Sequence, residues 1–339
     1  MLKKLFSESY RISYFCSVLQ TSIANNNIFF SKNGLASEAN SPLKILVTGG
    51  AGFIGSHAVI ALVEAGFEPV IVDDFSNSER TVLDGIRAIL GRDVTCYDAN
   101  CNDAEAMNRI FEVEPITGVI HFAASKAVGE SVLHPLKYYR NNLGSTMLLL
   151  DLMCQHKVHN LVFSSSCTVY GQPEQLPVTE ETPRLPAQSP YGNTKAICED
   201  IIRDTARAVA PLKAIALRYF NPIGAHPSAE IGELPRGVPG NLVPFLTQTA
   251  AGHRASLTVF GDDYNTPDGT CVRDFIHVLD LAEAHVKALQ LINQTNEDAS
   301  YDVFNIGTGQ GASVLELIKT FEDVNGIKLK YHIGGRREG

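Results

Sequence analysis

The amino-acid sequence predicts an α/β protein with a doubly wound parallel sheet of the Rossmann type, followed by a smaller C-terminal substrate domain. Short apolar runs such as "KILVT" and "NLVFSSS" alternate with longer amphipathic segments, which is the pattern of strands buried on both faces. A glycine-rich turn, "TGGAGFIG", joins the first run to a helical segment. With 339 residues, 45% of them hydrophobic, the chain can bury cores for two such units.

The elements are expected in a regular order. Strands are predicted at 44–48, 69–73, 118–124, 160–166 and 214–220, and helices from the glycine turn to Ala65, across 135–156 and from residue 190. Beyond Asn221 the sequence becomes rich in glycine and proline. The predicted division is a disordered extension over 1–42, a dinucleotide-binding domain over 43–220 and the substrate domain over 221–339.

Composition excludes several function classes. The formal net charge of −9 argues against nucleic acid as a partner, and no run of eighteen apolar residues predicts a membrane span. The seven cysteines are scattered without a CxxC pair, which indicates reduced thiols and a cytoplasmic protein. The ten histidines show no HExxH spacing, so no metal site is predicted.

The glycine turn has the features of a dinucleotide-binding loop. Gly49 permits a tight turn, Gly52 lets the backbone approach a pyrophosphate, and Gly55 allows the helix to pack closely on the strand. The second predicted strand ends in Asp73, with Asp74 beside it. A carboxylate there accepts hydrogen bonds from a ribose and repels a 2′-phosphate, so the predicted cofactor is NAD rather than NADP.

A tyrosine and a lysine stand four residues apart in "SPYGNTK". On a helix, Tyr191 and Lys195 share a face, and a nearby ammonium favours the phenolate of a tyrosine whose ordinary pKa is about 10. The preceding strand ends in "SSSCTVYG" at the sheet edge where such folds bind ligands, and Ser166 could hold a substrate oxygen there. Spacing alone would equally fit two surface residues. In chain order after the dinucleotide loop, the three residues predict a proton-transfer group.

Several longer strings carry a narrower resemblance. "VTGGAGFIGSH", "FSSSCTVYG", "LRYFNPIGAHPS" and "FGDDYNTPDGTCVRDFIHVLDLA" resemble the UDP-glucose 4-epimerases, extended members of the short-chain dehydrogenase/reductase superfamily, over residues 44 to 339. The resemblance implies an isomerase of galactose metabolism that interconverts UDP-glucose and UDP-galactose with a tightly held NAD. Hydride leaves carbon 4 while Tyr191 takes the hydroxyl proton, and the 4-keto sugar turns over before hydride returns. It also implies a homodimer.

The resemblance assigns site residues position by position. Its implied cofactor contacts are Gly49, Gly52, Phe53, Ile54, Gly55, Asp73, Asn77, Ser78, Asn100, Phe122, Ala123, Ala124, Lys126, Asn141, Tyr191, Lys195 and Phe220. Its implied substrate contacts are Lys126, Ser166, Tyr191, Asn221, Asn241, Thr258, Val259, Phe260, Arg273 and Arg336. Two arginines suit a diphosphate because guanidinium binds phosphate through two parallel hydrogen bonds, although Arg273 could instead form a surface ion pair with Asp274.

Three departures from the family pattern bear on these assignments. Asn100 stands where the family has an aspartate near the adenine, and an amide can still donate to and accept from the base. In "GELPRGVPGNL", Leu234 replaces an acid and Gly240 replaces an asparagine, while Asn241 remains. The sequence stops at Gly339, directly after "GRREG", whereas family members continue, so an incomplete second domain is expected.

Other functions fit parts of the pattern. Nucleotide-sugar dehydratases and decarboxylases share the fold and the Tyr/Lys pair, but carry an acid before "VYG", where this chain has Cys167 and Thr168. A catalytically inactive NAD-binding product is the alternative that an incomplete domain favours. Retention of both Tyr191 and Lys195 favours the enzyme.

Overall fold

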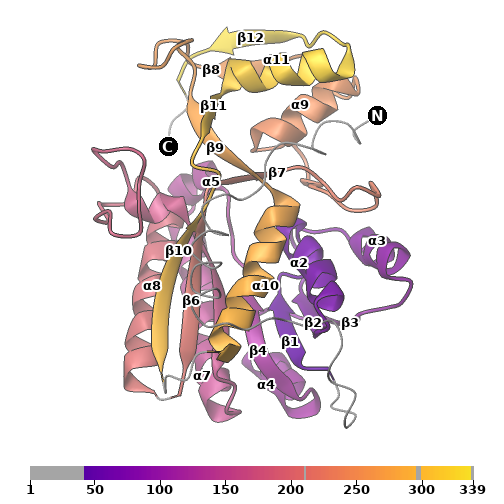
Figure 1. Ribbon diagram of the computed structural model, residues 1–339, viewed down its shortest axis with the longest axis vertical. Coiled ribbons are helices and arrows are strands. Elements are labelled where there is room, and N and C mark those ends of the chain that lie inside the picture. The colour runs from indigo at the N-terminus through magenta and orange to yellow at the C-terminus, as the bar shows by residue number, and fades with distance from the viewer. Residues whose placement is uncertain (1–41, 210, 295–298, 337–339) are drawn as a thin grey trace, which may run out of the picture.

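A seven-stranded parallel sheet forms the centre of the molecule. The computed structural model describes residues 42–209, 211–294 and 299–336. Within them the strand order is β10-β6-β5-β4-β1-β2-β3, and every pairing is parallel (Figure 1). The strands are β1 (Lys44–Thr48), β2 (Glu68–Asp73), β3 (Thr95–Asp98), β4 (Ile116–His121), β5 (Asn160–Ser166), β6 (Lys213–Tyr219) and β10 (Ser300–Ile306). The order reverses between β1 and β4, and folds of this kind bind ligands in the crevice at the carboxyl ends of these two strands. The predicted fold class is confirmed.

Helices cover both faces of this sheet. One face carries α2 (Phe53–Glu64), α3 (Thr81–Leu90) and α10 (Val278–Gln294), and the other carries α4 (Ala104–Val113), α7 (Gly144–Gln155) and α8 (Pro190–Ala208). Alternation along β1 shows why its sequence is continuously apolar: Ile45 and Val47 join the core beneath α2 and α10, whereas Leu46 joins the core beneath α4 and α7.

The helical segment predicted over 135–156 is confirmed in extent but is divided into three. It consists of α6 (Pro135–Tyr138), a π-helical turn (Tyr139–Leu143) and α7, preceded by α5 (Val128–Leu133). Asn142 lies in the turn and is buried, and its amide bonds both the N–H and the carbonyl of Ser125, at 2.8 and 3.1 Å, and the Thr194 hydroxyl at 3.0 Å. These three contacts fix the wider turn against the segment after β4 and against α8.

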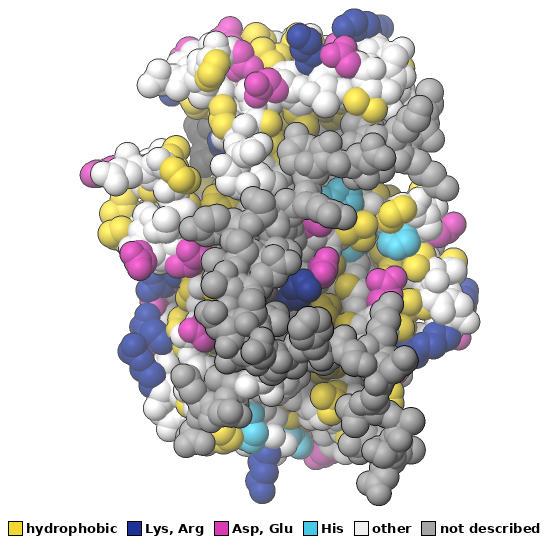
Figure 2. Space-filling model, in the orientation of Figure 1, with side chains coloured by type: hydrophobic (Ala, Val, Ile, Leu, Met, Phe, Trp, Pro, Cys, Tyr) yellow, Lys and Arg dark blue, Asp and Glu magenta, His cyan; other side chains and the backbone are white. Residues whose placement is uncertain are grey.

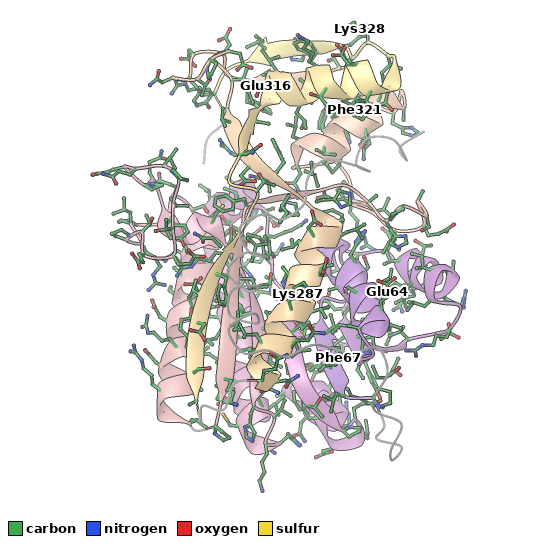
Figure 3. All side chains as sticks on the ribbon, viewed as in Figure 1. Glu64, Phe67, Lys287, Glu316, Phe321 and Lys328 are labelled. Atoms are coloured by element: carbon green, nitrogen blue, oxygen red, sulfur yellow. The ribbon has the colours of Figure 1, made fainter. Side chains whose placement is uncertain are left out.

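The second lobe is smaller and lies at the top of Figure 1. It contains a sheet of β7 (Asn221–Ile223), β9 (Val272–His277) and β11 (Gly311–Ser313), and a pair formed by β8 (Leu257–Phe260) and β12 (Tyr331–Gly334). Helices α9 (Leu242–Ala250) and α11 (Val314–Asn325) enclose its core, and Phe321 of α11 points toward α9 (Figure 3). The division at residue 220 stays a prediction, because α10 and β10 follow that point in the chain and pack with the large sheet.

The predicted extension over 1–42 lies outside the described residues except for its last position. None of the helices in the described ranges combines the length and the apolar character needed to cross a bilayer. On the described part of the face in Figure 2, acidic and basic side chains are interspersed rather than gathered into a patch of one sign.

Replacing Gly55 with alanine is expected to destabilise the fold. A Cβ built at this position would lie 2.2 Å from the Gly49 carbonyl oxygen, so helix and loop must separate, and we expect the free energy of unfolding to fall by roughly 1–3 kcal/mol. Gly129→Ala is the matched control, because its Cβ would meet nothing within 4 Å and alanine favours the helix. Denaturant unfolding measures both variants; equal unfolding midpoints would contradict this account of the loop.

Candidate active site

The glycine loop leaves its backbone open toward the crevice. Gly49 adopts a φ of +71°, and a Cβ there would lie 2.9 Å from the Ala123 nitrogen, so both conformation and space require glycine. A Cβ on Gly52 would meet only the Gly49 oxygen, at 3.1 Å, among the described atoms. Helix α2 begins after Gly52 without a side-chain cap from the described residues, which leaves its first N–H groups available to an anion. The loop therefore fits a pyrophosphate.

Asp73 ties this loop to the end of β2. Its carboxylate is buried and accepts hydrogen bonds from the Ala51 N–H at 3.0 Å, the Phe75 N–H at 2.9 Å and the Ser78 hydroxyl at 2.8 Å. A carboxylate offers about four acceptor positions, so a further ribose hydroxyl can still be bound. Asn77 beside it is exposed.

Asn100 lies at the same end of the crevice. Its amide donates to Asp74 at 2.7 Å, so the residue that replaces the expected aspartate is held beside the predicted ribose acceptor. The carry-over of Asn100 as an adenine contact stays a prediction.

The other cofactor candidates follow β4 and β6. The N–H groups of Phe122 and Ala123 donate to the Thr48 carbonyl at 3.0 and 3.1 Å, which fixes the chain beyond β4 against the glycine loop. Asn141 of the π-helical turn accepts from Asn102 at 3.2 Å. Phe220 follows β6, and a Cβ on Gly307 would lie 2.7 Å from its ring. All these positions lie at the carboxyl edge of the sheet, where the fold binds dinucleotides.

Three consecutive serines of β5 contact three successive turns of α8. The Lys195 ammonium donates to the Ser164 carbonyl oxygen at 2.6 Å, and the Ser165 hydroxyl donates to Glu199 at 2.5 Å. The Ser166 side chain lies close enough to the Tyr191 hydroxyl to lower its pKa. Because Tyr191, Lys195 and Glu199 are each four residues apart, they share one face of the helix, and β5 holds that face in register.

The start of α8 is also fixed locally. Ser189 is the N-cap, and its hydroxyl accepts a hydrogen bond from the Gly192 N–H at 3.2 Å. Pro190 occupies the first turn, where its missing N–H costs nothing. Tyr191 therefore projects from the first turn of the helix, at the carboxyl edge of the sheet.

Burial dominates the acid–base properties of the pair. Burial raises the pKa of Tyr191 and Tyr219 adds to that rise, while the hydrogen bond from Ser166 opposes it. Burial lowers the pKa of Lys195 to about 8, against the opposing influence of Cys198 and Glu199. Lys195 is thus poised near neutral pH. That its charge lowers the pKa of Tyr191 stays a prediction, because its ammonium bonds Ser164.

Cys167 and Thr168 supply no carboxyl group beside the tyrosine. Burial raises the pKa of the Cys167 thiol to about 11, although Arg273 opposes the rise, so the thiol stays neutral. The Thr168 hydroxyl donates to Ser166 at 3.0 Å. An additional acid or base for elimination of water is therefore missing at these two positions.

Two substrate candidates, Lys126 after β4 and Asn241 of the second lobe, are brought together by one acid. Asn241 donates to Glu233 at 2.6 Å, and the same carboxylate oxygen lies 3.6 Å from the Lys126 ammonium, so two of the candidates meet on one acid. Asn221 donates to the Asp274 carbonyl oxygen at 3.2 Å. The segment from Thr258 to Phe260 lies in β8, paired with β12.

The two candidate arginines differ in their surroundings. Arg273 is exposed and donates to the Val272 carbonyl at 2.8 Å, and in the described ranges it forms no ion pair. Asp274 accepts instead from Thr308 and Gly309, so the alternative pairing of Arg273 with Asp274 is not formed. Arg336 pairs with Asp263 at 2.8 Å on the surface. Arg273 also opposes the rise in the pKa of the Cys167 thiol, so it lies within electrostatic range of that residue.

Sequence reasoning missed three side chains that organise this site. Glu233 joins two substrate candidates, Tyr219 hydrogen-bonds the Ser164 hydroxyl, and Glu199 bonds Ser165. A signal existed for Glu199, which continues the four-residue spacing of Tyr191 and Lys195. Glu233 and Tyr219 carried no comparable pattern.

Comparison with known proteins identifies the family to which the chain is similar. A model described as the NAD dependent epimerase/dehydratase family matches residues 45–307. The UDP-glucose 4-epimerase of Bacillus subtilis is 51% identical over 298 residues, covering 88% of this chain and 86% of that protein. The Dictyostelium discoideum UDP-glucose 4-epimerase is 49% identical over 296 residues, covering 87% and 85%.

Solved structures agree. The UDP-glucose 4-epimerase of Bifidobacterium longum in complex with NAD+ and UDP superposes with a TM-score of 0.83 at 47% identity, covering 87% of each chain. The Stenotrophomonas maltophila enzyme, with bound NAD and formylated UDP-arabinopyranose, gives 0.84 at 46% identity, covering 88% of this chain and 87% of that one. The chain therefore belongs to the NAD dependent epimerase/dehydratase family, among its UDP-glucose 4-epimerases.

Proposed function

We propose that the chain interconverts UDP-glucose and UDP-galactose with NAD as its cofactor. The observation that carries this proposal is the contact of β5 with α8, which sets Tyr191, Lys195 and Ser166 together beside the dinucleotide crevice. The uncharged Cys167 and Thr168 favour epimerisation over dehydration. When bound, NAD supplies the acceptor and donor of hydride at carbon 4 of the sugar.

Each side chain of the site has its own role in the proposed reaction. Tyr191 takes the proton of the 4-hydroxyl group and later returns it, while the Ser166 hydroxyl holds the sugar oxygen against Tyr191. The ammonium of Lys195 stabilises the phenolate form of Tyr191. Arg273 and Arg336 bind the diphosphate, and Asn221 and Asn241 orient the nucleotide-sugar. A diphosphate held at a fixed point lets the sugar alone turn over.

The direct test uses the purified full chain. Incubation with UDP-galactose, without added cofactor, should yield UDP-glucose, because NAD remains with the enzyme through each cycle. A control incubation with the Tyr191→Phe variant accounts for contaminating activity. No product from a folded chain that carries NAD would contradict the proposal.

We also infer the oligomeric state and the cellular location of the protein. We expect a homodimer through the helices that follow β4, because Leu133 is 75% exposed and Leu136 62% exposed there, with Val132 and Met147 also exposed. The six cysteines within the described residues are free thiols, which supports a cytoplasmic protein.

Tyr191→Phe should leave NAD binding intact while it lowers turnover. The ring keeps its packing but loses the group that accepts the proton, and loss of an acid–base group typically reduces kcat by about 10² to 10⁴. Steady-state kinetics and the absorbance of bound cofactor measure the two properties. Unchanged kcat would remove Tyr191 from the assigned role.

Lys195→Ala should move the activity optimum to higher pH. Without the ammonium the pKa of Tyr191 rises further, so the phenolate that accepts the proton forms only at higher pH. The pH dependence of kcat measures the shift. A profile whose acidic limb coincides with that of the unmodified chain would exclude this role for Lys195.

Leu133→Glu should weaken the dimer. A charge on an apolar contact loses its hydration when the second copy binds, so the variant should behave as a monomer in sedimentation at concentrations where the parent is dimeric. Leu176→Glu is the control, since Leu176 is 80% exposed and lies far along the chain in the 172–188 loop. An unmodified chain that sediments as a monomer would contradict the expected assembly.

A further inference from the structure

We propose that Glu199 is a positioning residue that keeps Lys195 protonated and oriented toward Tyr191. This inference rests on the proposed function and adds a residue to its site. Glu199 lies two turns from Tyr191 and one turn from Lys195 on the same face of α8, and it is 1% exposed. A carboxylate buried this deeply is costly unless it is paired and hydrogen-bonded.

Glu199 is held by partners from three segments. The Arg218 guanidinium of β6 donates to its two oxygens at 2.8 and 2.5 Å, and the Ser165 hydroxyl of β5 donates at 2.5 Å. Arg184 lies 3.5 Å away. The bidentate pair with a buried arginine fixes the plane of the carboxylate, and with it the rotation of α8 against the sheet.

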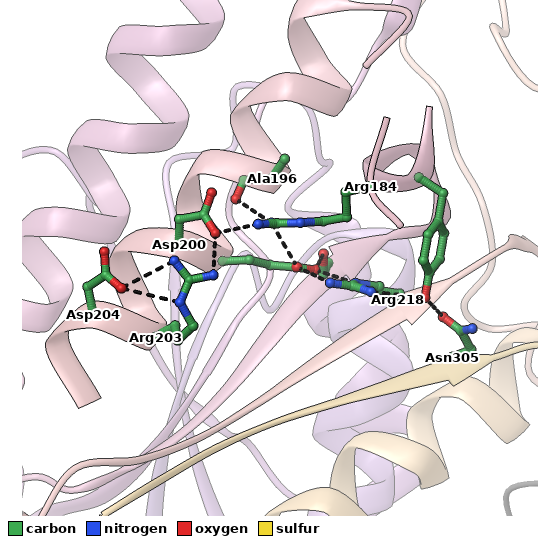
Figure 4. Close-up of polar contacts among 10 residues, drawn as sticks. Arg184, Ala196, Asp200, Arg203, Asp204, Arg218 and Asn305 are labelled. Atoms are coloured by element: carbon green, nitrogen blue, oxygen red, sulfur yellow. Dashed lines mark hydrogen bonds and ion pairs between the residues drawn. The ribbon is translucent and has the colours of Figure 1, made fainter. Parts of the chain in front are cut away.

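The pairing extends outward from this buried contact. Arg218 also donates to the Tyr170 hydroxyl at 2.9 Å, and that hydroxyl donates to Asn305 of β10 at 2.7 Å. Arg184 donates to Asp200 and to the Ala196 carbonyl, and Arg203 pairs with Asp200 (Figure 4). These contacts join one helix, α8, to strands β5, β6 and β10 and to the turn after β5. Several independent contacts therefore fix the position of Glu199.

While Tyr191 holds its proton, which burial favours by raising its pKa, the other titratable groups around the Lys195 ammonium are neutral, so the charge of Glu199 acts on Lys195. From β4, burial lowers the pKa of His121 to about 3. From α8, burial raises the pKa of Cys198, and from β6, burial raises the pKa of Tyr219 to about 12. From β5, Lys195 meets the Ser164 carbonyl and, at 4.8 Å, the Phe163 ring.

Among these described neighbours, Glu199 supplies the negative charge, and its own partners are Arg218 and, at 3.5 Å, Arg184. Burial lowers the pKa of Lys195 and Glu199 opposes that fall. Because the folded-state pKa of Lys195 is depressed, the ammonium is lost as the pH rises through about 8. Removal of the carboxylate charge depresses this pKa further, so the ammonium is lost at a lower pH.

Glu199→Gln tests the inference through the basic limb of the pH profile of kcat. We expect that limb to move to lower pH by about one unit, while Glu199→Asp, which keeps the charge, should leave the limb close to its position in the unmodified chain. A purely structural role would lower stability or activity at all pH values without moving the limb. A basic limb that coincides with that of the unmodified chain would overturn the inference.

Two further variants separate the effect of the Glu199 charge from misfolding and from a nonspecific effect of removing a carboxylate. Glu199→Gln leaves Arg218 buried and unpaired, so Glu199→Gln with Arg218→Met removes both charges and should fold while it retains the downward shift.

Glu114→Gln is the matched control: Glu114 accepts from Lys44 at 2.5 Å and Tyr97 at 2.7 Å at the opposite edge of the sheet, and its loss should leave the limb in place. An equal shift in Glu114→Gln would also overturn the inference, whereas an unmodified chain without epimerase activity would contradict the proposed function itself.

Discussion

The contact between β5 and α8 is the constraint on which the site depends. Ser164, Ser165 and Ser166 engage Lys195, Glu199 and Tyr191 in turn, so one strand sets the height and the rotation of the helix that carries the proposed proton-transfer group. The strand is central in a parallel sheet and buried on both faces, which makes it a rigid support. Small hydroxyl side chains allow the helix to approach closely and also satisfy its buried polar groups.

The positions of Tyr191 and Lys195 alone do not make them a proton-transfer pair, because their surroundings decide whether each side chain is charged. Lys195 and Tyr191 are both buried, and burial disfavours the charged form of each. A phenolate and an ammonium formed together stabilise one another, so each makes the charged state of its neighbour easier to reach. Glu199 and Arg218 form a buried ion pair next to this helix face, where water screens the charges little.

Much of the site could be predicted because its residues lie close to elements with clear local patterns. Gly49, Gly52 and Gly55 follow an apolar strand, Asp73 ends the next, and Tyr191 opens a helix after the serine cluster, so the carboxyl edge of a parallel sheet brings them together. Glu233 could not be found this way. It joins Lys126 to Asn241, residues distant in sequence, and such pairing depends on how a glycine- and proline-rich loop returns to the first domain.

The helix over 135–156 shows a similar limit. Its apolar period predicts one continuous helix, but the π-helical turn at Tyr139–Leu143 follows from the contacts of Asn142 with Ser125 and Thr194. Likewise Arg273 has an acid as its chain neighbour, yet Asp274 is engaged by the backbone after β10. In each case tertiary contacts determine the partner of the residue, and local sequence spacing carries no information about those contacts.

We infer that these residues support reversible transfer of hydride at carbon 4 of the bound sugar. Deuterium at that carbon distinguishes hydride transfer from proton exchange. The purified full chain would convert UDP-galactose labelled with deuterium at carbon 4, in ordinary water, and NMR would locate the label in the product. The account predicts UDP-glucose that keeps the deuterium at carbon 4. Product that has exchanged the deuterium for solvent hydrogen would contradict it.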